Sequence, residues 1–131
     1  RSLQLLARRL GIEDRVILLG YRNDVNEIYR CADIFAFPSR REGLGLAAIE
    51  AMASGLPIIT SNVHGINDYS IDGQTGFKCA ANDYRGLANA IEKLYFDKDL
   101  RSRMGNYNQE KAKSFDLSIS LRLMEGIYRS L

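Results

Sequence analysis

The sequence has few of the residues that build metal centres or disulfide scaffolds. Two cysteines and one histidine occur in 131 residues, and Cys31 and Cys79 are far apart, without the spacing of metal ligands. The sequence therefore gives no case for a zinc site. It favours reduced thiols in a cytoplasmic protein.

Long apolar runs and an excess of one charge are also lacking. No run approaches the roughly 20 residues that a membrane-spanning helix needs, and no signal peptide is evident, so we expect a soluble segment. Eighteen basic and sixteen acidic residues give a net charge of +2, which is too small to favour nucleic acid as a partner. The composition, 46% hydrophobic and 26% charged, is typical of one globular domain.

The sequence opens inside a helical pattern. Leu3, Leu6 and Leu10 recur at helical spacing, and Gly11 follows as a helix C-cap. No start methionine precedes this pattern. We therefore expect the sequence to be a piece of a longer chain.

Short apolar runs then alternate with helical patterns. Three continuous runs predict buried parallel strands, over residues 16–19, 34–37 and 56–60. A helix capped by Asn23 or Asp24 is predicted between the first two strands. A helix over residues 44–54, closed by Gly55, is predicted between the last two. This alternation predicts a doubly wound α/β sheet.

The remainder of the sequence is predicted to be mainly helical. A short edge strand is expected over residues 77–79, after a turn-rich segment. Apolar stripes over residues 83–131 then predict three helices. The one linker-like place is residues 114–116, where Asp116 could cap the last helix.

Glu50 is the only polar side chain in the run over residues 46–53. The alanines of this run favour a helix, and its other side chains make that helix apolar almost all round, which predicts burial on more than one face. A buried carboxylate without hydrogen bonds is costly. We therefore predict that Glu50 faces a polar cleft or accepts hydrogen bonds from groups that the sequence does not reveal.

The loop over residues 38–45 follows the second predicted strand, at the edge of the sheet where open α/β proteins bind ligands. Gly43 and Gly45 leave its backbone accessible, so that N–H groups at the start of the next helix could approach phosphate oxygens. Close helix packing is the alternative explanation for a lone Gly-x-Gly. Neither a Gly-x-Gly-x-x-Gly dinucleotide fingerprint nor a P-loop is present.

Two adjoining segments carry a more specific pattern, PSRREGLGL over residues 38–46 and EAMASGLPII over residues 50–59. They resemble the signature of family 4 glycosyltransferases of the GT-B fold, P-S-x-x-E-G-[FL]-G-L with a second glutamate eight residues after the first. The resemblance continues at residues 12–16, 19–21, 31–34, 72–77 and 87–91. It implies a Rossmann-like parallel sheet with flanking helices, as part of the C-terminal half of a GT-B fold.

The resemblance implies a binding site for a nucleoside-diphosphate sugar, the donor. Glu42 would be the catalytic residue, beside the hydroxyls of the donor sugar, and Glu50 would bind the ribose hydroxyls. The backbone N–H groups near the sugar and the diphosphate would come from Gly43, Leu44, Gly45 and Leu46.

At other positions that match the family pattern, the resemblance leaves more than one role open. Tyr21 and Arg22 correspond to the family loop along the nucleobase, where either could stack on the base, and a solvated loop is the alternative. Ser39 could hydrogen-bond the loop or the donor. Residues 64–68, HGIND, depart from the commoner G-G-x-x-E pattern and are more similar to members that build capsular polysaccharides or exopolysaccharides.

The resemblance implies a hexosyltransferase-like, retaining enzyme that needs neither a metal ion nor another cofactor. Its acceptor would be a polysaccharide or a lipid-linked glycan precursor, and nucleic acid would not be a partner. The alternatives are a non-catalytic nucleotide-sugar-binding or assembly module and, from the same fold, an epimerase or phosphorylase.

In these terms residues 1–131 are a partial C-terminal, donor-binding domain whose C-terminal helices occupy about residues 83–131. The N-terminal acceptor domain of the same chain, and the first two strands of the present domain, would lie outside the sequence. We therefore expect the piece to be inactive alone. A cytoplasmic location is expected, and a peripheral association of the full-length enzyme with the inner face of the membrane stays open.

Overall fold

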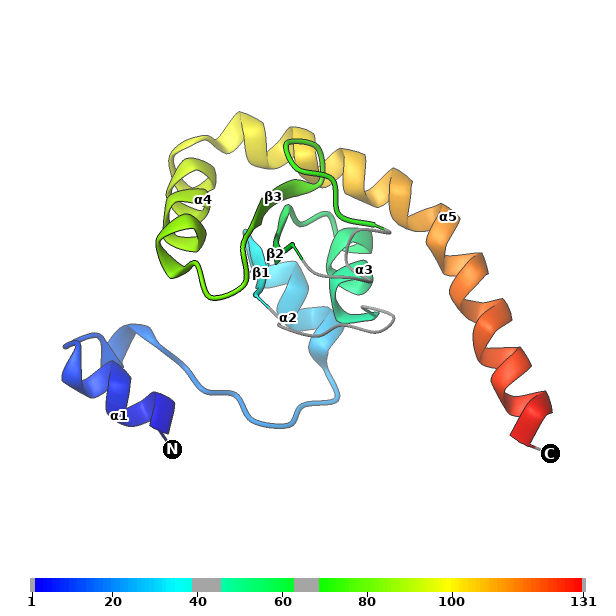
Figure 1. Ribbon diagram of the computed structural model, residues 1–131, viewed down its shortest axis with the longest axis horizontal. Coiled ribbons are helices and arrows are strands. Elements are labelled where there is room, and N and C mark those ends of the chain that lie inside the picture. The colour runs from blue at the N-terminus through cyan, green and yellow to red at the C-terminus, as the bar shows by residue number, and fades with distance from the viewer. Residues whose placement is uncertain (1, 39–45, 63–68, 131) are drawn as a thin grey trace.

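The structure, a computed structural model, describes residues 2–38, 46–62 and 69–130 (Figure 1). A small sheet lies between helices, and in this view the long C-terminal helix runs above the sheet and then down the right side. In chain order the elements are helix α1 (Ser2–Arg9), 3-10 helix η1 (Glu13–Arg15), helix α2 (Val25–Cys31), strand β1 (Phe35–Phe37), helix α3 (Leu46–Ala53), strand β2 (Ile58–Ser61), strand β3 (Gly76–Cys79), helix α4 (Tyr84–Phe96) and helix α5 (Lys98–Ser130).

The sheet is parallel, with the order β1-β2-β3. Phe35 pairs with Ile58, and Ile58 pairs with Gly76. Every residue of the central strand β2 is buried, whereas β3 is an edge strand. The sequence predicted these three strands to within two residues at each end, and the predicted α/β class is confirmed.

The core has two parts because successive side chains of a strand point to opposite faces of the sheet. Ile58 packs on the face that is covered by α2 and α3, together with Tyr29 and Met52. Ile59 packs on the other face, in a cluster with Ala90, Leu94 and Met104 of α4 and α5. Helices on both faces are the arrangement that a parallel sheet requires.

Helix α3 ends at a glycine, as predicted. Gly55 has φ +84°, its N–H donates to the carbonyl of Met52 at 2.9 Å, and the N–H of Leu56 donates to the carbonyl of Ala51 at 3.1 Å. This is a Schellman motif. Gly105 of α5 lies directly against the carbonyl of Gly55, where a Cβ atom would overlap the oxygen. A side chain at position 105 would therefore separate α5 from the end of α3.

Asn108 joins α5 to the two strand entries. Its side chain is fully buried, and Nδ2 donates to the carbonyl oxygens of Leu56 and Thr75, each at 2.8 Å. Leu56 precedes β2 and Thr75 precedes β3. One amide group therefore fixes the helix to the starts of two neighbouring strands.

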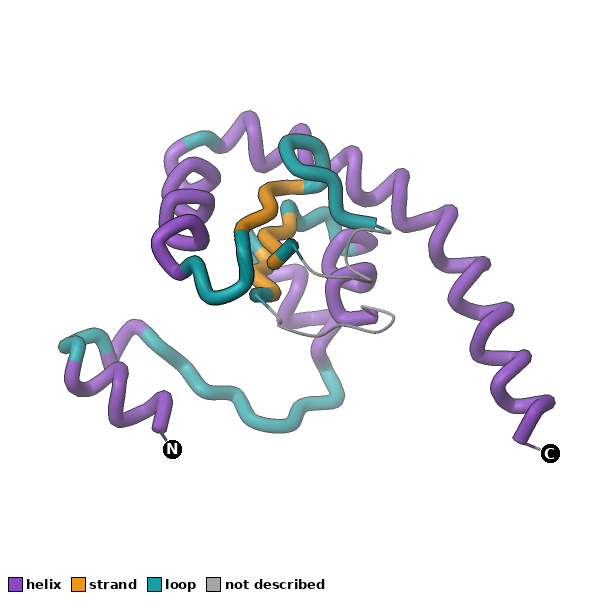
Figure 2. Tube along the Cα trace, viewed as in Figure 1, coloured by secondary structure: helices purple, strands orange, loops and turns teal. Residues whose placement is uncertain are grey.

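The strand predicted over residues 16–19 is absent. This segment is extended beside η1 but lies apart from the sheet, and its four apolar side chains are exposed, Ile17 to 79% (Figure 2). Apolar content favours a strand only where a neighbouring strand supplies hydrogen bonds. Within the described residues, β1 has a strand beside it only on the β2 side.

The prediction of three helices after residue 83 is also wrong. The described chain forms two, because α5 continues without a break over 33 residues and Asp116 lies inside it. No proline interrupts residues 114–116, and serine or aspartate inside a helix costs less than about 1 kcal/mol. None of the described helices combines the length and apolar character needed to cross a bilayer.

Replacing Asn108 by alanine should lower the free energy of unfolding by about 2 kcal/mol, because the buried carbonyl of Leu56 loses its hydrogen bond. The measurement is urea unfolding followed by circular dichroism. Asn106→Ala, at an exposed position of the same helix, is the matched control and should change stability by less than about 0.5 kcal/mol. Equal effects of the two substitutions would contradict the bracing role of Asn108.

Gly105→Ala sets two effects of opposite sign against each other. Helix propensity favours alanine by about 1 kcal/mol, whereas the overlap with the Gly55 carbonyl should cost about 1–3 kcal/mol. We expect net destabilisation in the same unfolding assay, while the exposed control Ser102→Ala should be neutral or slightly stabilising. A more stable Gly105→Ala variant would show that the two backbones are not in contact.

Candidate functional site

The predicted site begins where β1 ends. The chain leaves this strand at Pro38 and is described again from Leu46, the first residue of α3. The predicted catalytic residue and four predicted donor-binding positions lie outside the described residues: Glu42, Ser39, Gly43, Leu44 and Gly45. The same holds for the HGIND segment over residues 64–68.

Glu50 lies on the exposed face of α3. Four residues of this helix are buried, namely Ala48, Ile49, Ala51 and Met52. Leu46 and Glu50 are exposed, and their spacing of four residues places them on the same side of the helix. Burial is therefore confirmed for half of the residues of α3, but not for Glu50, whose carboxylate is accessible to a ligand.

Tyr29 reaches α3 from α2. Its side chain is 8% exposed, and its hydroxyl donates to the carbonyl oxygen of Ala47 at 3.4 Å. Burial raises the pKa of Tyr29, and the negative charge of Glu50 raises that pKa further. The phenol is therefore protonated, and a donor, at neutral pH. The sequence analysis gave Tyr29 no role in the site; the signal that could have found it is the need of a buried tyrosine hydroxyl for a hydrogen-bond partner.

Tyr21 and Arg22 precede α2 and line a pocket of about 510 Å³. Leu19, Asn23 and Asp24 line the same pocket. The Tyr21 side chain is 96% exposed and is free to stack on a ligand. Arg22 donates from Nε and Nη2 to the two carboxylate oxygens of Asp24, at 2.8 and 2.6 Å. The guanidinium hydrogen bonds lower the pKa of Asp24. Asp24 consequently occupies the N-cap position of α2 without capping it.

The described site residues thus form two pairs. One pair is Tyr21 and Arg22, which line the same pocket, and the other is Leu46 and Glu50, which lie on the same side of α3. Helix α2, which follows the first pair in the chain, packs against α3. Within the described residues, no hydrogen bond or ion pair joins one pair to the other. Among the residues that the structure describes, no group of three or more histidine, cysteine, aspartate or glutamate side chains could hold a metal ion.

A second pocket, of about 440 Å³, was not predicted from the sequence. It lies beyond the carboxyl ends of β1 and β3 and is lined by Pro38, Cys79, Ala80, Asn82, Asp83, Tyr84 and Leu87. The Asp83 carboxylate accepts a hydrogen bond from the N–H of Gly86 and so caps α4. Cys79, which lines this pocket, and Cys31 are free cysteines in the structure.

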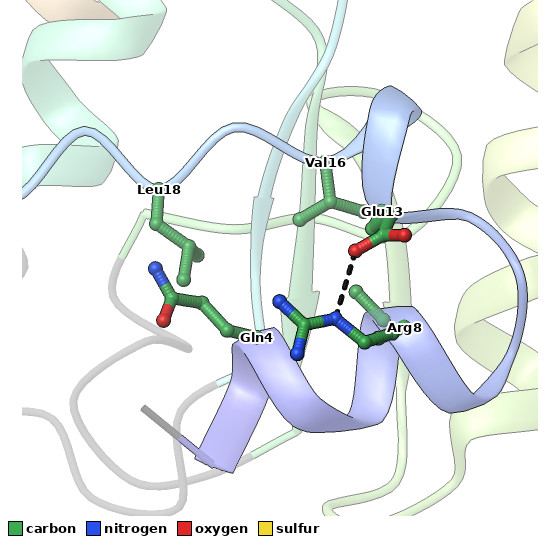
Figure 3. A pocket seen from close by; sticks show the side chains of 6 residues that line it. Gln4, Arg8, Glu13, Val16 and Leu18 are labelled. Carbon is green, nitrogen blue, oxygen red and sulfur yellow. Dashed lines mark hydrogen bonds and ion pairs between the residues drawn. The ribbon is translucent and has the colours of Figure 1, made fainter.

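A third pocket, of about 260 Å³, lies between α1 and the extended segment that follows η1 (Figure 3). Gln4 and Leu18 point toward one another across it, and Arg8 forms an ion pair with Glu13 at 3.0 Å. Both charged side chains are exposed, so this pair contributes little to stability.

The comparisons with known proteins agree with the sequence signature. Residues 1–111 match the family described as glycosyl transferases group 1. The capsular polysaccharide biosynthesis glycosyltransferase CapM of Staphylococcus aureus is 34% identical over 116 residues, which cover 88% of this chain and 30% of CapM. The D-inositol 3-phosphate glycosyltransferase of Corynebacterium jeikeium is 37% identical over 131 residues, covering 98% of this chain and 31% of the relative.

Solved structures show the same similarity. Sucrose-phosphate synthase from Thermosynechococcus elongatus superimposes with a TM-score of 0.87 and 31% identity, over 99% of this chain and 33% of that one. Anabaena HepE in complex with UDP has a TM-score of 0.86 and 27% identity, over 99% of this chain and 36% of HepE. The chain spans about 30% of the length of the curated relatives. It belongs to the group 1 glycosyl transferases, and its α/β domain is related to their GT-B structures, as the sequence signature implied.

Proposed function

We propose that this chain supplies the donor-binding site of a glycosyltransferase that moves a sugar from a nucleoside diphosphate to an acceptor. The observation that carries the proposal is the placement of Glu50. It is an exposed carboxylate on a helix whose neighbouring positions are buried, and it occupies the second glutamate position of the signature. A ligand that offers hydrogen-bond donors accounts for a carboxylate held at that place.

Glu50 is proposed to bind the ribose of the donor. A vicinal diol presents two O–H groups, and the two oxygens of one carboxylate can accept both in charge-assisted hydrogen bonds. Because α3 is packed on its other faces, the carboxylate is presented from a rigid element. In the same proposal Tyr21 stacks on the base, Glu42 is the catalytic residue, and the backbone over residues 43–46 binds the sugar and diphosphate.

The relatives support a uridine nucleotide as the first donor to test. HepE was solved with UDP and with UDP-glucose, and the pneumococcal O-GlcNAc transferase GtfA, 26% identical with a TM-score of 0.80, was solved with UDP and GlcNAc. An Escherichia coli relative, 32% identical over 119 residues, is named for transfer of galactose to a diphosphoundecaprenol-linked sugar. A polysaccharide or lipid-linked glycan is accordingly the proposed acceptor class, and retention of configuration the proposed outcome.

The reaction is proposed to need no metal ion. The departing diphosphate carries negative charge, which helix N-termini and basic side chains can stabilise in place of a divalent cation. Residues 1–131 alone are proposed to be inactive, because the acceptor site would come from another domain.

Glu50→Ala, made in the complete natural polypeptide that carries this sequence, should weaken binding of UDP-glucose about tenfold or more, because a charge-assisted hydrogen bond is lost. Isothermal titration calorimetry gives the affinity. Glu92→Ala, which removes an exposed carboxylate from α4, is the matched control and should leave the affinity unchanged. Unchanged affinity in Glu50→Ala would sink the ribose assignment.

Removal of divalent ions should leave the activity intact. The rate of sugar transfer by the complete polypeptide is measured through the nucleoside diphosphate that is released. We expect this rate to change by less than about twofold after treatment with EDTA, because no step is assigned to a metal. Loss of transfer that Mg²⁺ or Mn²⁺ restores would overturn this part of the proposal.

A further inference from the structure

We infer that Tyr29 is a positioning residue of the donor site: its hydroxyl holds the first turn of α3 and so fixes the direction in which Glu50 is presented. This inference rests on the proposed function. Tyr29 itself is buried and is not assigned any contact with the donor.

The ring of Tyr29 is held in one orientation by aromatic neighbours. It meets Phe35 edge-on, with ring centroids 5.7 Å apart and planes at 89°. Phe35 in turn stacks on Phe37, at 5.8 Å and 22°. Both phenylalanines belong to β1. The ring of Tyr29, and with it the hydroxyl, is therefore held by residues of the sheet.

The hydroxyl acts on the start of α3. It donates to the carbonyl oxygen of Ala47, the second residue of that helix, at 3.4 Å. Glu50 follows three residues later, about one helical turn away and therefore on a neighbouring part of the surface. A carbonyl oxygen has two lone pairs, so this bond can form beside the helical one.

The opposite end of α3 is fixed independently. Gly55 closes the helix and lies against Gly105 of α5. With one end held by α5 and the other by Tyr29, rotation of the helix about its axis is restrained. Loss of the Tyr29 hydroxyl should make the first turn of α3, next to Glu50, more mobile. The Glu50 charge is also close enough to influence the titration of the phenol, which agrees with this arrangement.

Tyr29→Phe separates positioning from core packing, because phenylalanine keeps the ring and loses only the hydroxyl. In the complete natural polypeptide, we expect the Kd and KM for UDP-glucose to rise about 3- to 10-fold, the range for one hydrogen bond, with kcat within about twofold. Hydrogen exchange over residues 46–53 should become faster. Tyr95→Phe, which removes a hydroxyl from an exposed tyrosine of α4, is the matched control and should change none of these values.

A double-mutant cycle with Glu50→Gln tests whether Tyr29 acts through Glu50. If it does, the double variant should bind donor no more weakly than Glu50→Gln alone, within about twofold. Fully additive losses would overturn the inference, and so would a Tyr29→Phe variant with wild-type donor affinity.

The failure of the proposed function gives a different result. A wild-type polypeptide that binds none of UDP-, GDP- and ADP-glucose would reject the donor site itself, and the inference would fall with it. Wild-type binding with no effect of Tyr29→Phe rejects only the positioning role.

Discussion

The contact between α5 and the end of α3 is the constraint on which the rest of the structure depends. Gly105 lies against the carbonyl of Gly55, and one turn further along α5 the amide of Asn108 donates to Leu56 and Thr75. These groups fix the C-terminal helix against the starts of β2 and β3. They also pack against the residue at which α3 ends, so α3 and α5 are held together at that point.

Helix α3 connects this framework to the proposed chemistry. Its buried side chains pack in the core beside β2, and its exposed face carries Leu46 and Glu50. Tyr29 contacts its first turn from α2, so packing from two directions acts on one short helix. A carboxylate on such an element can be presented to a ligand with little conformational freedom, which is the physical basis for assigning Glu50 to the donor.

The sequence predicted those features that local chemistry determines. Gly55 ended a helix because a residue with positive φ was needed there, and continuous apolar runs marked the strands that were paired in the sheet. Residues 16–19 have the same local character, but pairing needs a neighbour, and the described structure places none beside them. Asp116 resembled a helix cap although the helix continues through it. The contacts of Tyr29 and Asn108 join residues distant in sequence, and no periodicity reveals them.

The central claim is that α3 presents Glu50 to the ribose of a nucleotide donor. The most direct test is an experimental structure of the complete natural polypeptide with UDP bound. We predict that both ribose hydroxyls lie within hydrogen-bond distance of the Glu50 carboxylate, with the uracil toward Tyr21. A ribose bound away from α3, for example in the pocket lined by Tyr84 and Leu87, would contradict the account.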